Sequence, residues 1–171
     1  GTPSGAADFN LAVAKTLKEM LEIGGAKVYL IREEDREIPV AKRVAAINAI
    51  KQDGYYLRID HSVWIEGGPS VIGGHYAGNQ VAENYAKAIL QQLNIGIVET
   101  PVETVQDLKS PEIRSTNKIA LTLEIRSINH PDLNETADSP ARVVQEAYAI
   151  FLGTYQFLRG GELPQTQLEV Q

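Results

Sequence analysis

Glu124 stands near the end of the segment KIALTLEIRS (residues 118–127), where a buried strand would ordinarily carry only apolar side chains. A carboxylate in a cleft can act as a general base that takes a proton from water. A buried carboxylate is also commonly held in an ion pair, and Arg126 and Arg58 are the nearest candidates along the predicted strands. Both interpretations of Glu124 stay open from the sequence.

His61 closes a second such segment, YYLRIDH (residues 55–61), directly after Asp60. Imidazole is the commonest metal ligand, but it is equally a frequent structural hydrogen-bonding group. His75 follows a glycine pair and His130 precedes a proline, and both positions favour a structural or solvated role. The chain contains no HExxH, P-loop or GxGxxG motif, so any chemistry must come from dispersed residues.

Apolar residues at helical spacing alternate along the chain with short β-branched or aromatic segments, which is typical of an α/β domain. The predicted strands cover residues 27–32, 55–61, 69–76, 96–100 and 118–126, and residues 101–117 are predicted to be an irregular connection. Helices are predicted from Asp8, from Pro39 and from Ser139, with a further helix before residue 96. The helical residues expected to face the core are Leu11, Ala14, Leu17, Leu21, Val40, Val44, Ile47, Ile50, Val81, Tyr85, Ala88, Ile89, Leu93, Val143, Val144, Ala147, Tyr148, Phe151 and Tyr155. We therefore expect a three-layer α/β fold with helices flanking a mostly parallel central sheet.

Functional groups in open α/β sheets lie at the carboxyl ends of strands. Arg32, the Asp60–His61 pair and Glu124 with Arg126 occupy such ends. Because side chains alternate along a strand, Glu124 and Arg126 share one face and Leu121, Leu123 and Ile125 the other. We expect Glu124 to face His61 across a crevice.

The composition sets limits on the class of protein. A length of 171 residues predicts one domain, which we place at residues 1–158 with a C-terminal tail at 159–171. The net charge of −6 disfavours nucleic acid as a partner, and the absence of a long apolar segment predicts no membrane span. The chain has no cysteine, which excludes disulfides and thiolate metal sites.

The segment NLAVAKTLKEMLEIGGAKVYLIREEDREIPVAKRVAAINAI (residues 10–50) resembles the zinc-dependent N-acetylmuramoyl-L-alanine amidases of catalytic type 3. Arg32, Asp35, Arg43 and Asn48 match positions of that family, although we expect Arg32 and Arg43 to be structural. LRIDHS (57–62) and LTLEIRSINHPD (121–132) resemble two later segments of the family, and the resemblance extends over residues 6–158.

The resemblance implies a hydrolase of bacterial peptidoglycan that cleaves the amide between N-acetylmuramic acid and L-alanine. It implies a zinc ion that activates water, Glu124 as the catalytic base, and His61 as a metal ligand, with Asp60 as the alternative ligand. The substrate lies outside the cytoplasm, so the resemblance also implies a periplasmic or extracellular location.

The early metal ligands of the family have no match in this sequence. The family's first histidine lies on a Gly-His-Gly-Gly turn, of which GTPSGA would be a remnant, and its glutamate ligand falls on Ala6 when counted back from Asn10. A single histidine does not make a catalytic zinc site. The alternative function is therefore a metal-free amidase-like domain that binds cell-wall glycan or a protein partner without hydrolysis. An unrelated doubly wound ligand-binding domain is a third interpretation.

Overall fold

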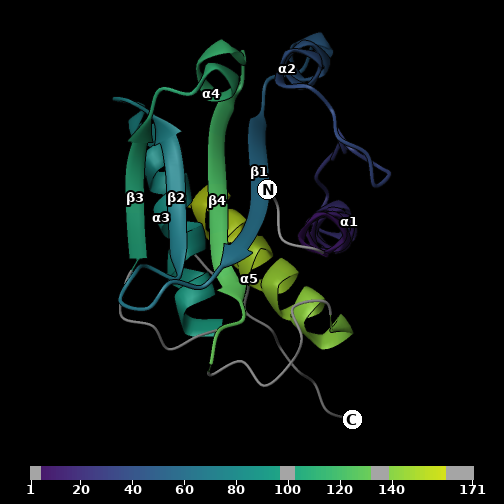
Figure 1. Cartoon of the computed structure of the whole chain (residues 1–171). Coiled ribbons are helices and arrows are strands. Elements are labelled where there is room, and N and C mark those ends of the chain that lie inside the picture. The colour runs from purple at the N-terminus through teal and green to yellow at the C-terminus, as the bar shows by residue number, and fades with distance from the viewer. Residues whose placement is uncertain (1–4, 97–102, 132–138, 161–171) are drawn as a thin grey trace.

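The computed structural model describes residues 5–96, 103–131 and 139–160 of the chain. Its centre is a four-stranded sheet made of β1 (Tyr55–Val63), β2 (Val71–Tyr76), β3 (Glu103–Leu108) and β4 (Ile119–Ile128), in the order β1-β4-β2-β3 (Figure 1). β1 pairs with β4 and β2 with β3 in parallel, whereas β2 and β4 are antiparallel. The predicted α/β class is confirmed, and the sheet is mixed, with two parallel pairings and one antiparallel pairing.

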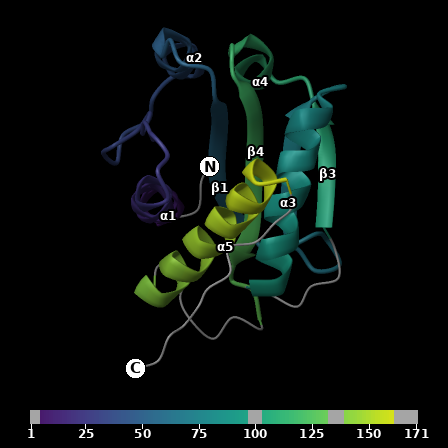
Figure 2. The same ribbon diagram turned by 180° about the vertical axis from the view of Figure 1, so that it is seen from behind.

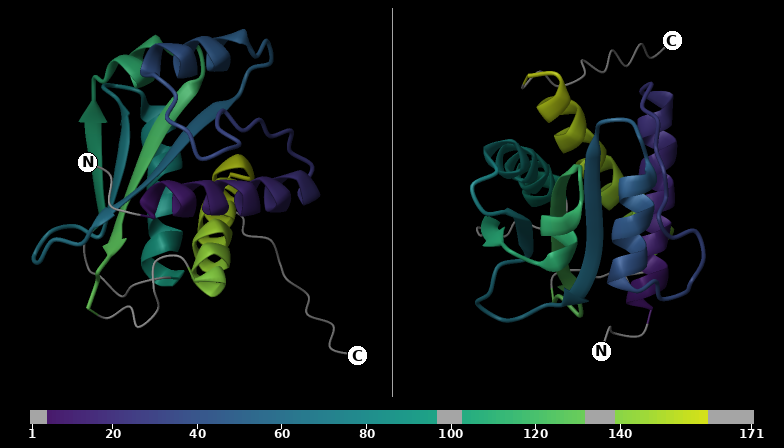
Figure 3. Two further views of the ribbon diagram at one scale, coloured as in Figure 1. Left: turned by 45° about the vertical axis from the view of Figure 1, so that its right-hand side comes forward. Right: turned by 90° about the horizontal axis from the view of Figure 1, so that it is seen from above.

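The described part of the chain also forms five helices: α1 (Ala6–Ile23), α2 (Val40–Ala49), α3 (Gln80–Gly96), α4 (Pro111–Ser115) and α5 (Pro140–Leu158). α3 and α5 lie together on one face of the sheet, as the view from behind shows (Figure 2). α1 packs against α5 and the edge strand β1, while α2 and α4 lie near the end of the sheet where β1 and β4 begin (Figure 3). None of the described helices is long and apolar enough to cross a lipid bilayer.

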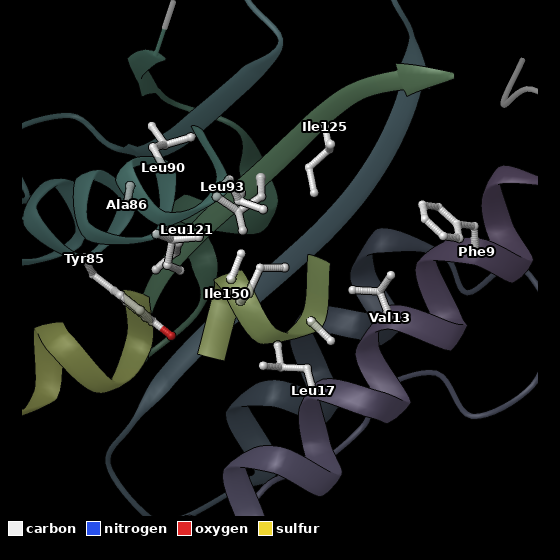
Figure 4. Close-up of a cluster of buried hydrophobic side chains, with 14 residues drawn as sticks. Phe9, Val13, Leu17, Tyr85, Ala86, Leu90, Leu93, Leu121, Ile125 and Ile150 are labelled. Carbon is white, nitrogen blue, oxygen red and sulfur yellow. The ribbon is translucent and has the colours of Figure 1, made fainter. Parts of the chain in front are cut away.

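The hydrophobic core fills the space between the sheet and α1, α3 and α5 (Figure 4). Its fully or nearly fully buried members include Phe9, Val13, Leu17, Tyr85, Ile89, Leu93, Leu121, Leu123, Ile125 and Ile150. α3 and α5 approach closely at Gly153, where an added Cβ would lie 2.5 Å from the Cα atom of Ile89. Only glycine therefore fits this crossing without a shift of the helices.

Two strand predictions are wrong. Residues 27–32 form no strand, and the edge strand β1 of the described sheet pairs with β4 alone. Residues 101–117, predicted to be irregular, contain β3 and α4. β3 was missed because ETVQDL is short and polar, as edge strands often are. The predicted strand at 96–100 is wrong at Gly96, which ends α3, and its other residues lie outside the described part of the chain.

The strands predicted at 55–61, 69–76 and 118–126 correspond to β1, β2 and β4. Among the helical positions expected inside, Leu17, Ile47, Tyr85, Ile89, Leu93 and Ala147 are buried, but Val40, Val81, Val144 and Tyr148 are exposed. α1 begins at Ala6 after Gly5 rather than at Asp8, and it buries Phe9 and Val13 in place of Leu11 and Ala14. α5 ends at Leu158, and most of the predicted tail lies outside the described residues.

Candidate functional site

His61 and Glu124 lie on opposite faces of the sheet. In the parallel register of β1 and β4, Asp60 pairs with Glu124 and His61 pairs with Ile125. Register partners on neighbouring strands project from the same face, and consecutive residues project from opposite faces. His61 therefore shares the face of Ile125, which lies in the core beneath the helices. The expectation that His61 faces Glu124 across a crevice is wrong.

His61 is the centre of a buried polar cluster between β1, α1 and α5. Its Nδ1 faces the side-chain oxygen of Asn10, and its Nε2 faces a carboxylate oxygen of Glu146. The second oxygen of Glu146 accepts a hydrogen bond from Arg142 Nε at 2.8 Å, and the ring of Phe9 packs edge-on against the imidazole with its centroid 4.2 Å away. Both ring nitrogens are engaged, so His61 presents no donor to a metal here.

The opposite face of the sheet carries a group of polar side chains that we call the site face: Arg58, Asp60, Ser62, Glu124 and Arg126. Glu124 Oε1 accepts hydrogen bonds from Ser62 Oγ at 2.9 Å and from Arg126 Nε at 3.0 Å. The Glu124 side chain is 41% exposed, so water and ligands reach its carboxylate. The pairing with Arg126, left open by the sequence, is thus present alongside an accessible carboxylate.

Asp60, on the same face, is held by an ion pair with Arg58. Arg58 Nε lies 2.7 Å from Asp60 Oδ2, and the Asp60 side chain is 39% exposed. Arg58 therefore pairs with Asp60, two residues along its own strand, and not with Glu124. The result is two carboxylates side by side on neighbouring strands, each tied to its own guanidinium group.

A buried carboxylate, Glu112 at the start of α4, anchors Arg58 from the other side. Arg58 Nη1 donates to Glu112 Oε2 at 3.0 Å, Arg43 donates from Nε and Nη2 at 3.0 Å each, and the Tyr56 hydroxyl donates to Oε1. Burial alone would raise the pKa of Glu112, but the hydrogen bonds from Arg43 and Tyr56 and the charge of Arg58 outweigh it and hold that pKa below its ordinary value. Burial, with the hydrogen bond to Glu112, raises the pKa of the Tyr56 hydroxyl.

Neither Glu112 nor Glu146 is predicted from the sequence to be buried or functional. Glu112 lies in the segment predicted to be irregular, although Ser110-Pro111 gives the same helix-start signal as Ser139-Pro140. In each case the serine side chain accepts a hydrogen bond from a backbone N–H of the first turn. That signal predicts a helix but not the burial of the glutamate that follows it.

The other residues singled out by sequence are structural. Arg32 donates to the carbonyl of Ala7 at 2.7 Å and lies 3.5 Å from Asp35, in agreement with the structural role expected for it. Asn48 holds the turn before β4, because its Oδ1 accepts from Asn117 N at 2.8 Å and its Nδ2 donates to Ser115 O at 2.9 Å.

Of the remaining two histidines, His75 lies on the core face, because it pairs with Leu121 in the register of β2 and β4. His75 is buried between Asp107, 3.2 Å from its Nε2, and the carbonyl of Tyr76, which its Nδ1 contacts at 2.9 Å. His130 is buried, with its ring 5.1 Å from that of Trp64. His75 therefore adds no donor beside Glu124.

Comparison with known proteins identifies the fold around this site. A family model described as N-acetylmuramoyl-L-alanine amidase matches residues 2–154. The chain belongs to this amidase family. No curated protein sequence matches the chain.

Three solved amidases show the same fold at low sequence identity. AmiC2 of Nostoc punctiforme has a TM-score of 0.74 and 17% identity, with 93% of this chain and 88% of that chain covered. CwlD from Clostridioides difficile, solved in complex with the GerS lipoprotein, has a TM-score of 0.77 and 17% identity, with 90% and 86% covered. Ami1 from Mycobacterium smegmatis has a TM-score of 0.76 and 15% identity, with 94% and 81% covered.

The described residues do not fit the zinc centre that the amidase family implies. No group of three or more histidine, cysteine or acidic side chains within residues 5–96, 103–131 and 139–160 is arranged to hold a metal. Ala6, where the resemblance places a glutamate ligand, is buried and has no donor atom. Asp60 and Glu124 are the carboxylates on the site face, and both are paired with arginine. Catalytic zinc normally has three protein ligands, usually with histidine among them.

Proposed function

We propose that this amidase-family chain acts on peptidoglycan by hydrolysing the amide between N-acetylmuramic acid and L-alanine. The family match over residues 2–154 supports the substrate and the reaction class. The accessible carboxylate of Glu124, at the position that the resemblance gives to the catalytic base, is the observation that carries the proposal.

Glu124 would act as the general base. Ser62 and Arg126 fix its carboxylate by two hydrogen bonds to Oε1, and Oε2, which no other described residue engages, would accept a proton from water. The water oxygen would bond to the carbonyl carbon of the lactyl group, the carbon–nitrogen bond would break, and the same carboxyl group would return the proton to the departing amine of L-alanine. In this family a zinc ion activates the water, but the donor set described above does not fit that ion, so we assign no step of the reaction to a metal.

Binding of cell-wall glycan or a protein partner without hydrolysis is the second candidate function. The specific observation in its favour is that both carboxylates of the site face are held by guanidinium groups. An amidase fold with such a face retains a surface for the wall polymer even if it does not cleave it.

Peptidoglycan digestion tests this proposal. Purified chain is incubated with insoluble peptidoglycan, and newly exposed L-alanine amino groups are counted against time. The Glu124→Gln variant keeps the shape of the side chain but cannot accept the proton, so we expect at least an approximately 100-fold lower rate. Glu19→Gln, which changes an exposed carboxylate on α1, is the matched control and should retain the full rate. Undiminished release by Glu124→Gln would reject the role of Glu124, and sedimentation with peptidoglycan without any release would favour the second candidate.

The proposed substrate also sets the proposed location. Peptidoglycan lies outside the cytoplasmic membrane, so we propose that the chain works in the periplasm or at the cell exterior. Secretion of the native protein, followed by detection in the cell-wall fraction, is the corresponding measurement.

A further inference from the structure

We propose that the site face operates with arginine as its cation: Arg58 and Arg126 supply the positive charge beside Asp60 and Glu124, and no zinc ion binds there. This inference takes only the identity of the ligand, peptidoglycan, from the proposed function. It departs from the family, whose members are zinc-dependent, and it rests on how the side chains of the site face are held.

Arg58 is fixed at the side of Asp60. Its Nε lies 2.7 Å from Asp60 Oδ2, and its Nη1 donates to Glu112 at 3.0 Å. Glu112 is itself buried and is bound in bidentate fashion by Arg43. The guanidinium group of Arg58 therefore cannot swing away without breaking a contact to a buried carboxylate, which is costly. A divalent cation on Asp60 would face this permanently charged group at short range.

Arg126 forms the corresponding ion pair with Glu124. Its Nε lies 3.0 Å from Glu124 Oε1, the oxygen that also accepts from Ser62. The Arg126 side chain is 19% exposed, against 41% for Glu124, so arginine is the more buried member of the pair. The loop between β1 and β2 packs over it, since an added Cβ on Gly68 would lie 3.5 Å from Arg126 Nη1. Packing thus restrains the second cation as well.

The nitrogen donors that zinc prefers are absent from the described part of this face. His61 is turned to the core and engaged by Asn10 and Glu146, and His75 is engaged by Asp107 and Tyr76. What remains beside Glu124 is one further carboxylate, Asp60, and two guanidinium groups. Such a set matches carboxylate-bearing ligands, because a guanidinium group binds carboxylate through directed hydrogen bonds. The peptide stems of peptidoglycan carry such carboxylates.

Two measurements on the full chain test the inference. In the first, the chain is dialysed against excess zinc and then against buffer, and bound zinc is measured by mass spectrometry for the wild type, Asp60→Asn and Glu124→Gln. In the second, sedimentation with insoluble peptidoglycan is measured with and without a chelator, at low and at high sodium chloride. Arg126→Gln is the test variant, and Arg36→Gln, on an exposed loop, is its matched control.

We expect no stoichiometric zinc that depends on Asp60 or Glu124, and we expect wall binding that is unchanged by the chelator but weakened by salt. Arg126→Gln should weaken wall binding about tenfold, as expected for loss of a charge-assisted hydrogen bond, and Arg36→Gln should not. Zinc retained equally by the wild type and both carboxylate variants is bound elsewhere and agrees with the inference.

One equivalent of zinc that is lost in Asp60→Asn or Glu124→Gln would overturn the inference, as would wall binding that the chelator abolishes. The two proposals fail separately. Amide cleavage that requires zinc at Asp60 would uphold the proposed function and overturn this inference. Wall binding that resists the chelator but is not accompanied by cleavage would overturn the proposed function and uphold this inference. If the chain does not sediment with peptidoglycan at all, the zinc measurement still decides the inference.

Discussion

Asp60 and Glu124 are register partners on the parallel strands β1 and β4, and their carboxylates project side by side from the same face of the sheet. This relationship moves the candidate site by one residue along β1, from His61 to Asp60. A shift of one residue in a strand exchanges the two faces. The site is therefore a paired-charge surface, and the histidine beside it belongs to the core.

Removal of Glu146 should destabilise the fold strongly. In Glu146→Ala, His61 and Arg142 lose their shared acceptor inside the protein, and breaking a buried pair in this way typically costs about 3–5 kcal/mol. Urea denaturation followed by circular dichroism measures the free energy of unfolding. Gln145→Ala, at an exposed neighbouring position of α5, is the control and should change it by less than about 0.5 kcal/mol. Equal stability of the two variants would contradict the assigned role of the cluster.

Glu112 should make the stability of the chain depend on pH in the acid range. Its pKa is lower in the folded state than the ordinary value of 4.5, because the bonds from Arg43 and Tyr56 and the charge of Arg58 outweigh its burial. A depressed pKa gives a stabilisation that is complete above the unfolded-state value and is lost as the pH falls through the folded-state value. Wild type should thus exceed Glu112→Gln in unfolding free energy at pH 7, and the difference should shrink below pH 4.5.

The control for this experiment is Glu37→Gln, which changes an exposed carboxylate. Its difference from the wild type should stay small at every pH. A difference between wild type and Glu112→Gln that grows on acidification would contradict the sign worked out for Glu112.

Gly153 should not tolerate a side chain. The added Cβ of Gly153→Ala would lie 2.5 Å from Ile89 Cα, so α3 and α5 would have to separate, and overpacking of this kind costs about 1–3 kcal/mol. Thermal unfolding compares this variant with Gly54→Ala, where an added Cβ meets nothing within 4 Å. A melting temperature for Gly153→Ala at or above that of Gly54→Ala would show that the helices do not cross as described.

The positions of the inner strands β2 and β4 could be predicted from the sequence because these strands carry apolar side chains. The alternation of Leu121, Leu123 and Ile125 with Glu124 was correctly predicted, and it fixes which groups share the site face. Alternation within a strand does not determine which residues of two neighbouring strands stand side by side. Only the register between β1 and β4 shows that Asp60, and not His61, stands beside Glu124.

The missed features depend on contacts between distant segments. Arg142 and Glu146 are charged and spaced four residues apart on α5, a pattern typical of a solvent-facing ion pair. They are buried because His61, more than 80 residues earlier, lies opposite and supplies a polar partner. Residues 27–32 have strand-forming side chains, but a strand also needs a neighbour, and local pattern does not reveal whether one is present.

The most direct test of the account is a titration of the isotope-labelled chain with a soluble muropeptide, followed by the backbone amide signals in NMR spectra. We expect the largest shifts at Asp60, Ser62, Glu124 and Arg126 and in the loop that follows β1, with the same result when a chelator is present. Shifts confined to another surface, such as the hollow lined by Glu83, Lys87, Gln91 and Val105, would contradict the assignment of the site face.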